Sequence, residues 1–295
     1  MTRIPACSIG IMAYNEEANI GRLLDTLLKE TPGGFIIREI IIVSSGSTDG
    51  TETIVREYAE RDPKVIPLIQ KKREGKASAV NLFLARAAGD LLILESADTV
   101  PATGAIEKLL QFFNDPRVGM VGARPVPVNT GKNLVAFAVR KMWRLHHLIS
   151  LEKPKVGEMV AFRPIVEKIP VETAVDEACI EAIIKKKGFR ICYAPDAVVY
   201  NRGPGTVKEF LRQRRRIAAG HRHLALTSGY RVSTTNPLRI MKFLFRDMAW
   251  SVREIMYTIS TVLLEMAGRF LGLYDFYVRK KNPYVWDVSD STKRL

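Results

Sequence analysis

Short apolar runs alternate with helical patterns along the first half of the chain. The clearest run, Leu91-Leu92-Ile93-Leu94, ends abruptly in the polar segment 95–99. Consecutive aliphatic residues without polar alternation are typical of a strand buried on both faces, as in a parallel sheet. Comparable runs occupy residues 7–12, 40–43, 65–69 and 118–121, and helical spacing is found at residues 20–28, 54–59, 76–88 and 102–113.

This alternation predicts an α/β domain with a mostly parallel, Rossmann-like sheet and helices on both faces. Strand–helix–strand units make parallel pairs with right-handed crossovers. Beyond residue 127 the alternation loosens, but Thr206 and Glu209 still form a capping-box signature for a long helix that contains residues 213–217. We also expect helices at 134–151 and 176–187, and strands at 157–162, 190–193 and 197–200.

The C-terminal region, residues 233–295, differs in pattern from the domain that we assign to residues 1–232. A helix predicted at 238–252 carries several basic residues, and a second helix at 255–273 is mostly apolar. Its longest uncharged run is shorter than the roughly 18 residues of an unambiguous spanning helix. We therefore predict amphipathic helices that lie in or partly enter a bilayer, with simple caps on the domain as the alternative.

The net charge limits the classes of partner, and the cysteine spacing indicates the redox compartment. The formal net charge of +14 favours an anionic partner, such as nucleic acid, an acidic lipid surface or a phosphorylated substrate. Cys7, Cys179 and Cys192 show no paired spacing, which favours a reducing compartment and makes a structural zinc site improbable. No secretion signal is evident, so we expect the catalytic part to face the cytoplasm.

Asp98 is the first candidate for a metal ligand. It follows the buried strand at 91–94, and open α/β sheets bind ligands just outside the carboxyl ends of their strands. A carboxylate there suits Mg²⁺ or Mn²⁺, which would keep its remaining positions for phosphate oxygen and water. The alternative is that Asp98 caps the helix that follows.

Seven motifs occur in a fixed order between residues 8 and 224. They are AYNEE (13–17), STDGT (47–51), GKASAVN (75–81), SAD (96–98), GEMVAFR (157–163), DE (176–177) and QRRRI (213–217). Together they resemble family 2 glycosyltransferases, which are inverting enzymes with the GT-A fold. Within that family, the chain is similar to membrane-associated sugar transferases that use polyprenyl or dolichyl phosphate, with a reduced cellulose-synthase-like layout.

The resemblance implies which residues bind the nucleotide-sugar. Ser96 stands where the family has the first Asp of its DxD motif, and the family usually has Asp at position 45. Lys76 would contact a phosphate, although a solvated loop lysine is an equal alternative. The implied nucleotide-sugar residues are Tyr14, Asn15, Glu16, Ser45, Lys76, Ser96 and Asp98, with Asp98 also on the metal.

The resemblance also implies the catalytic and acceptor residues. Asp176 and Glu177 occupy the place of the family's acidic pair, where a carboxylate takes the proton of an attacking hydroxyl. For Asp176 the alternative is a helix N-cap. Gln213 and Arg216 share one face of the predicted helix and Arg214 lies beside them, so this helix can hold a diphosphate or an acceptor. Arg163 of the GEMVAFR motif is a further candidate for the same role.

The leading functional hypothesis is a metal-dependent, inverting hexosyltransferase acting at the cytoplasmic face of the cell membrane. It would move mannose or glucose, with GDP-mannose a candidate donor, to a lipid-linked acceptor, preferably dolichyl or polyprenyl phosphate. Such an acceptor needs cations and no base. The candidate cations are Arg140, Arg144, Arg163, Arg214 and Arg216.

Three alternatives remain. The acceptor could be a hydroxyl group of a lipid-linked or surface glycan. A nucleotidyltransferase would need a glycine-rich basic loop where residues 14–17 are acidic. A non-catalytic module that binds anions or membranes would have no use for Asp98, Asp176 and Glu177, and no nucleic-acid-binding motif is evident.

Overall fold

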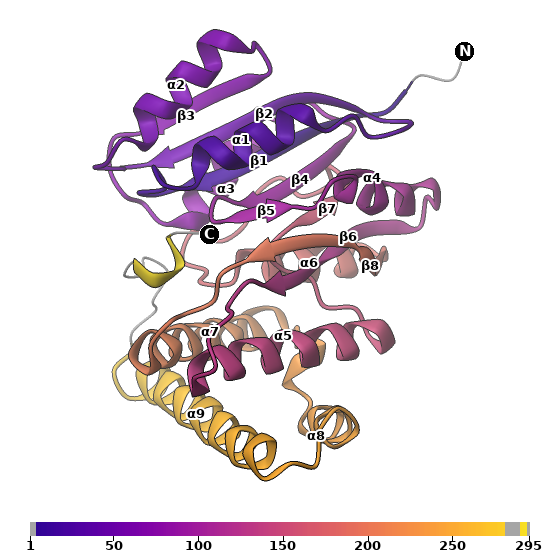
Figure 1. Cartoon of the computed structure of the whole chain (residues 1–295). Helices are drawn as coiled ribbons and strands as arrows, with labels where there is room; N and C mark the ends of the chain where they lie inside the picture. Colours follow the sequence, from indigo (N-terminus) through magenta and orange to yellow (C-terminus); the bar gives the residue numbers. More distant parts are fainter. Residues whose placement is uncertain (1–3, 281–289, 294–295) are drawn as a thin grey trace.

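The strands within the described residues, 4–280 and 290–293, form one eight-stranded sheet at the centre of the computed structural model (Figure 1). They are β1 (Ala6–Ala13), β2 (Ile36–Ser45), β3 (Val65–Gln70), β4 (Leu91–Ser96), β5 (Thr99–Pro101), β6 (Val118–Pro127), β7 (Val160–Phe162) and β8 (Arg190–Asn201). Their order across the sheet is β3-β2-β1-β4-β7-β6-β8-β5.

The sheet is mixed. β1 pairs in parallel with β2 and β4, β2 with β3, and β6 with β8. β7 lies antiparallel between β4 and β6, and β5 is antiparallel to β8. The α/β class is therefore confirmed, whereas the sequence reasoning overlooked β5 and the direction of β7. Both strands have three residues, too few to show a period.

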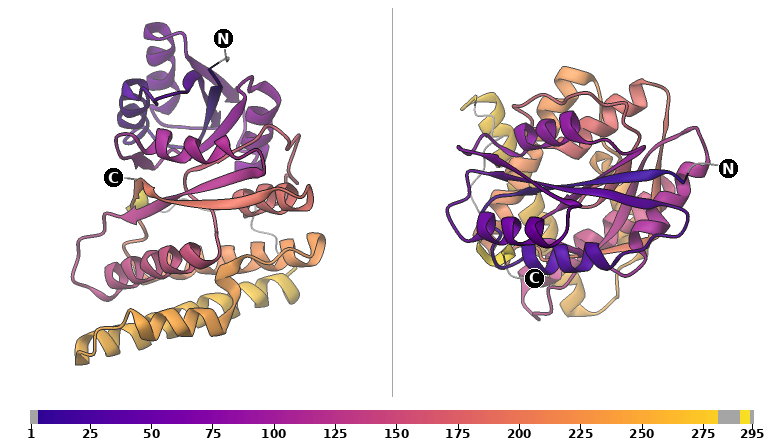
Figure 2. Two further views of the ribbon diagram at one scale, coloured as in Figure 1. Left: turned by 90° about the vertical axis from the view of Figure 1, so that its right-hand side faces the viewer. Right: turned by 90° about the horizontal axis from the view of Figure 1, so that it is seen from above.

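Helices cover both faces of the sheet (Figure 2). On one face, the core includes Leu23, Val55 and Ile106; on the other, it includes Phe83 and Ile180. The helices that supply these and the following contacts are α1 (Ile20–Lys29), α2 (Thr51–Arg61), α3 (Lys76–Arg86), α4 (Ala105–Leu110), α5 (Leu134–Glu152), α6 (Asp176–Lys186), α7 (Val207–Ser228), α8 (Pro237–Arg246) and α9 (Val252–Tyr277), with 3₁₀ turns at Gln111–Asn114, Ser233–Thr235 and Asp290–Thr292.

Burial on both faces explains the aliphatic runs of the central strands. Ile9 of β1 pairs with Ile40 of β2 and Ile93 of β4, and all three side chains are buried. Gly10 lies directly against the Phe83 ring of α3, where a Cβ would come within 2.6 Å of ring atoms. Helix α3 can therefore approach the sheet closely only because position 10 lacks a side chain.

Helices α5, α7, α8 and α9 form a separate layer beyond the sheet (Figure 1). The predicted capping box is confirmed: the Thr206 hydroxyl accepts from Glu209 N at 3.2 Å at the start of α7. Helix α9 packs closely on α7 because it has glycine at the contact. A Cβ on Gly268 would lie 2.6 Å from Arg214 Cβ, and one on Gly272 would lie 2.5 Å from Arg215 O.

The amphipathic pattern of α9 is inverted relative to that of an ordinary surface helix. Its buried residues are small or polar: Thr258, Thr261, Gly268, Gly272 and Asp275. Large apolar side chains face outward in what we call the outer apolar stripe, which comprises Met256, Ile259, Leu263, Met266 and Phe270, each more than half exposed. Among the described residues, no helix combines the length and the apolar character needed to cross a bilayer.

Two C-terminal predictions need correction or remain open. The helix predicted at 238–252 is shorter than expected: α8 ends at Arg246, where Asp247 accepts from Arg144 Nε at 3.0 Å, and the second helix, α9, begins at Val252 after Ser251, which caps it through Glu254 N at 3.2 Å. Residues 281–289 and 294–295 of the predicted C-terminal region lie outside the described residues. The division at residues 232 and 233 and the contact with a membrane stay predictions.

Candidate active site

One cavity of about 1400 Å³ opens between the carboxyl ends of β1, β2 and β4 and the layer of α5, α7, α8 and α9. At the sheet it is lined by Tyr14, Ser45 and Asp98. At the far end it is lined by apolar side chains of α8 and α9, including Met241 and Val262. The cavity thus joins a polar end at the sheet edge, where α/β sheets bind ligands, to an apolar end among the outer helices.

Asp176 and Glu177 lie side by side in the first turn of α6 and share one cation. Lys76 Nζ, at the start of α3, lies 2.9 Å from Asp176 Oδ2 and 2.8 Å from Glu177 Oε1. The phosphate contact of Lys76 stays a prediction. In the structure its ammonium lies against both carboxylates and fixes their positions.

The pKa values of Asp176 and Glu177 differ, although both carboxylates contact Lys76. Burial and the charge of Glu177 raise the pKa of Asp176 to about 6. Burial also acts to raise the pKa of Glu177, but the charge and hydrogen bond of Lys76 outweigh it and lower that pKa to about 2. The two groups titrate as a pair, and the upper step lies near the pH at which a carboxylate is an effective base.

Asp98 is surrounded by further carboxyl groups. Burial raises the pKa of Asp98, and the nearby Lys293, Lys76 and Arg216 partly oppose this. Burial and the charge of Asp98 raise the pKa of both Glu16 and Glu158 to about 7. Buried acids with too little countercharge favour a bound cation.

Asp98, Glu16 and Glu158, which we call the acid cluster, are chemically suited to a divalent ion. They do not surround such an ion completely. Within residues 4–280 and 290–293, no three His, Cys, Asp or Glu side chains are arranged to hold a metal by themselves. Ligands from a diphosphate and from water would have to complete the coordination, as Mg²⁺ commonly requires. The Lys293 ammonium already lies against the Glu16 carboxylate, so this end of the cavity accommodates positive charge.

Tyr14 and Ser45 line the predicted donor end, whereas Asn15 does not. The Arg73 guanidinium lies 4.0 Å from the centre of the Tyr14 ring, and the Ser45 hydroxyl accepts from Glu74 N at 3.3 Å. Asn15 has a left-handed φ of 53° and accepts from Thr48 N at 2.8 Å. In the structure its side chain joins the β1–α1 loop to the β2–α2 loop, and its nucleotide contact stays a prediction.

Four of the predicted arginines have other partners. Arg163, which is absent from the cavity lining, donates to Val118 O at 2.8 Å, and Arg140 donates to Asn129 O at 2.6 Å. Arg144 pairs with Asp247 at 3.0 Å. Arg214 lines the cavity, but it pairs with Glu265 of α9 at 2.8 Å. In the structure carbonyl or carboxylate groups contact these side chains, and their roles in binding phosphate stay predictions.

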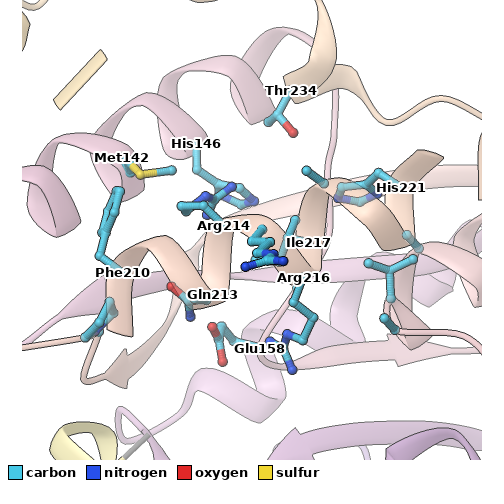
Figure 3. Close-up of a pocket in the computed structure, with 18 of the residues that line it drawn as sticks. Met142, His146, Glu158, Phe210, Gln213, Arg214, Arg216, Ile217, His221 and Thr234 are labelled. Carbon is cyan, nitrogen blue, oxygen red and sulfur yellow. The ribbon is translucent and has the colours of Figure 1, made fainter. Parts of the chain in front are cut away.

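Arg216 and Gln213 keep their predicted place on α7. Both line the cavity, and Figure 3 shows them near Glu158. Burial lowers the pKa of Arg216, while Asp176, Glu177 and Glu158 act in the opposite direction, so this guanidinium interacts with the carboxylate pair. Ser96 also lines the cavity and donates to Glu158 O at 3.4 Å.

Comparison with known families identifies the chain. The family described as "Glycosyl transferase family 2" matches residues 8–163, and the family described as "Glycosyl transferase family group 2" matches residues 91–273. The chain belongs to glycosyl transferase family 2. These matches include all the elements that line the sheet end of the cavity.

Curated relatives of this family 2 glycosyltransferase are longer than the chain itself. The probable glycosyltransferase YdaM of Bacillus subtilis is 27% identical over 247 residues, which cover 77% of this chain and 57% of the relative. Poly-beta-1,6-N-acetyl-D-glucosamine synthase of Staphylococcus aureus is 25% identical over 79% of this chain and 59% of the relative. The chain thus matches less than two thirds of either protein.

Solved structures support the GT-A fold of the family 2 chain. The mannosyltransferase PcManGT from Pyrobaculum calidifontis, in complex with GDP-Man and Mn²⁺, superposes with a TM-score of 0.61 at 22% identity, covering 96% of this chain and 83% of that one. Glucosyl-3-phosphoglycerate synthase from Mycobacterium tuberculosis has a TM-score of 0.53 at 16% identity, covering 78% and 82%. At these identities the similarity concerns the fold.

Several cavity residues of this family 2 glycosyltransferase escaped the sequence reasoning. Glu158 has a positive φ of 61°, unusual for a residue other than glycine, and its only sequence signal was its place inside the GEMVAFR motif. Lys293 donates to Tyr14 O at 2.8 Å from a segment 279 positions away. Lys155, His146 and His221 also line the cavity, but none belongs to a motif. Tertiary proximity alone brings these residues together.

Proposed function

We propose that this chain transfers a mannosyl or glucosyl residue from a nucleoside diphosphate sugar to a lipid-linked acceptor, with a divalent ion and with inversion. The site would face the cytoplasm at a membrane surface. The observation that carries the proposal is the single cavity running from the acid cluster and the Asp176–Glu177 pair to apolar side chains beneath α8 and α9. A polar donor and an acceptor with a lipid tail fit its two ends.

The donor would bind at the sheet end of the cavity. Tyr14, Arg73 and Ser45 offer a stacking surface and a hydroxyl for the nucleoside, and Asp98 with Glu16 or Glu158 would hold the ion. A bound Mn²⁺ or Mg²⁺ would neutralise charge on the departing diphosphate. The complexes of PcManGT with GDP-Man and Mn²⁺, and of the mycobacterial synthase with UDP and Mn²⁺, support this choice of ligands.

The carboxylate pair and Arg216 would act beside the anomeric carbon. Inversion requires the acceptor to attack from the face opposite the departing diphosphate. Lys76 holds Asp176 and Glu177 in place, so the pair can orient the sugar or receive a proton without moving. Arg216 would balance the negative charge that accumulates when donor and acceptor are both bound.

The preferred acceptor is a polyprenyl or dolichyl phosphate, whose nucleophilic oxygen is already anionic. The apolar far end of the cavity and the net charge of +14 support it. A hydroxyl of a lipid-linked or surface glycan is the second candidate, favoured by one observation: the pKa of Asp176 is raised to about 6, as suits a general base. Family membership sets aside the nucleotidyltransferase and the non-catalytic module.

A donor and acceptor panel tests the proposal directly. The full chain would be incubated with GDP-mannose or UDP-glucose, Mn²⁺, and either polyprenyl phosphate or a polyprenyl diphosphate-linked sugar. We expect release of the nucleotide to depend on the metal and product formation to depend on the lipid acceptor. Water-soluble sugars accepted as well as the lipids would contradict the lipid-linked acceptor.

The pH dependence of transfer to a hydroxyl acceptor tests the role of the carboxylate pair. With a hydroxyl acceptor, the rate should be constant above pH 7 and fall as the pH drops through about 6, because the carboxylate pair then gains a proton. The measurement is kcat/KM between pH 5 and pH 8 for wild type and Asp176→Asn. An acid limb that persists unchanged in the variant would assign the titration to another group.

The outer apolar stripe of α9 would attach the protein to the membrane. Trp250 is 74% exposed between α8 and α9, and α8 carries the basic residues Arg239 and Arg246. Apolar side chains next to cations are the features of a helix lying in the interface of an anionic bilayer. Because α9 already buries its polar side against α7, its apolar side remains available.

Weakening this stripe should release the protein from lipid. A triple variant, Ile259→Ser, Leu263→Ser and Phe270→Ser, should bind vesicles of phosphatidylglycerol and phosphatidylcholine at least 10-fold more weakly, since each apolar side chain contributes about 1.5–3 kcal/mol when buried. Flotation measures this. Val171→Ser, which changes an exposed apolar residue away from α9, is the matched control. Equal flotation of the triple variant and wild type would contradict the proposed attachment.

A further inference from the structure

Three basic side chains outside all the recognised motifs line the active-site cavity. His146 comes from α5, His221 from α7 and Lys155 from the segment after α5. Figure 3 shows His146 and His221 at the cavity together with Arg214 and Arg216. We call Lys155, His146 and His221 the Lys155 subsite.

Electrostatic interactions connect the Lys155 subsite with Glu177 of the carboxylate pair. Burial lowers the pKa of Lys155, while the charges of Glu181, Glu177 and Glu158 act to raise it. Burial lowers the pKa of both histidines, and the charge of Lys155 lowers them further. Lys155 therefore lies within electrostatic reach of Glu177 and of both imidazole rings.

The polar atoms of the subsite lack protein partners. In the part of the chain that the structure describes, Lys155 makes no ion pair through its ammonium group, and neither ring nitrogen of the buried His146 has a hydrogen-bond partner. His221 Nδ1 is likewise unpartnered. Buried polar groups in native proteins are nearly always paired, so this cluster is suited to a ligand that enters the cavity.

The charge state of the cluster indicates what kind of ligand fits. The pKa of His221 is lowered to about 3 and that of His146 lies well below 6.5, so both rings are neutral and each carries one N–H donor. Lys155 adds the ammonium charge. One cation with two neutral donors matches an oxyanion better than it matches an uncharged sugar.

The surroundings favour a phosphate group on a lipid. The cavity continues from this cluster to Leu244 and Val262, which could cover an apolar chain. Several other cations that line the cavity are paired with acids: Arg214 with Glu265, Lys141 with Asp247 and Glu254, and Arg215 with Asp275. Lys155 has no such ion pair with another described residue, so its charge is available to an incoming anion.

We propose that Lys155, His146 and His221 bind the phosphate group of the lipid-linked acceptor. The Lys155 ammonium supplies the countercharge, and the imidazole N–H groups donate to phosphate oxygens. This assignment rests on the proposed function and specifies its acceptor site. It applies equally when that phosphate is the nucleophile and when it joins the lipid to a sugar that carries the attacking hydroxyl.

Binding of short isoprenoids tests the assignment without turnover. Farnesyl phosphate, farnesol and inorganic phosphate would be titrated against the full chain in neutral detergent micelles, with phosphatidic acid as a second lipid phosphate. Wild type should prefer farnesyl phosphate over farnesol by about 10- to 100-fold, the range expected for hydrogen bonds to a charged group. Inorganic phosphate should compete weakly. Phosphatidic acid that binds as tightly as farnesyl phosphate would indicate a general headgroup site and overturn the acceptor assignment.

Variants then assign the preference to the subsite. Lys155→Met should abolish the preference for farnesyl phosphate, Lys155→Arg should keep most of it, and His146→Phe should reduce it several-fold. Lys153→Met removes an exposed lysine of the same segment and should have no effect. Thermal unfolding and Mn²⁺-dependent binding of GDP-mannose or UDP-glucose report folding and the donor site separately in each variant.

The outcomes separate this proposal from the proposed function. An undiminished preference in Lys155→Met, or no preference in wild type, would overturn the assignment of the subsite while donor binding still supported the transferase. Loss of the preference in Lys155→Met with intact donor binding would support the assignment. A wild-type protein that binds neither nucleotide-sugar would instead contradict the proposed function.

Discussion

The Asp98→Asn variant is expected to lose metal-dependent binding of the nucleotide-sugar, and its transfer rate should fall at least about 10³-fold. A divalent ion contributes several kcal/mol by neutralising the leaving diphosphate. Asp98 is the carboxylate common to the acid cluster, since its charge raises the pKa of both Glu16 and Glu158. An amide at this position offers a weaker ligand with no charge.

The loss should not come from unfolding. Burial raises the pKa of Asp98, which means that its charged form is disfavoured in the folded protein. Removing that charge should leave thermal stability without metal unchanged or slightly higher. Titration of nucleotide with and without Mn²⁺, together with thermal unfolding, measures both effects. Asp196→Asn, an exposed carboxylate outside the cavity, is the matched control.

A different result would reassign the metal. If Asp98→Asn binds the nucleotide-sugar with the same response to Mn²⁺ as wild type, the ligand must be another carboxylate of the cluster. Glu158→Gln and Glu16→Gln would then be compared in the same titration. An absence of any Mn²⁺ response in wild type would remove the metal from the mechanism.

The Glu177→Gln variant should lose about 10²- to 10⁴-fold in transfer rate to a hydroxyl acceptor, the range typical of losing a general base, because the charge of Glu177 raises the pKa of Asp176 and the two carboxylates act as one pair. With a lipid phosphate acceptor the loss should be much smaller, because that nucleophile carries no proton that must be removed. Glu177 also binds Lys76 at 2.8 Å, and glutamine can still accept this hydrogen bond. The geometry of the site should therefore survive.

The comparison needs both acceptors and a separate reading of each constant. We would measure kcat and KM for polyprenyl phosphate and for a polyprenyl diphosphate-linked sugar with wild type, Glu177→Gln and Arg216→Ala. Arg216→Ala should impair transfer to both acceptors, since this guanidinium offsets negative charge and takes no part in proton transfer. A base-type loss confined to the hydroxyl acceptor, with no transfer to lipid phosphate by wild type, would overturn our preferred acceptor.

Local sequence pattern predicted most elements because their burial is simple. The central strands are buried on both faces, so they appear as aliphatic runs, and Ile9 and Ile93 illustrate this. The capping box of α7 was visible because its hydrogen bonds join residues three positions apart. The end of α8 was predicted at residue 252 instead of 246, because the Asp247 side chain that ends α8 is bound by Lys141 and Arg144 of α5, more than 100 positions away.

The same distinction applies to the site residues: local pattern places the acids, whereas the partners of the arginines are distant in the sequence. The acids Asp98, Asp176 and Glu177 follow strands or begin a helix, so the chain order of elements already places them at one edge of the sheet. For the arginines, sequence could supply charge but not partners. Arg163 donates to backbone carbonyls outside the cavity lining, and Arg214 is paired with Glu265, contacts that no local pattern encodes.

The sequence by itself determined the α/β class, the family resemblance and the acidic residues of the site, because each of these depends on short-range periodicity or on motifs a few residues long. Only the tertiary structure decided that Lys76 holds the carboxylate pair, that Lys293 reaches Glu16, and that Lys155 lines the cavity without an ion pair to another described residue. These outcomes depend on which distant groups share a buried volume. Coulomb energies change steeply with distance and burial, and the order of residues along the chain specifies neither.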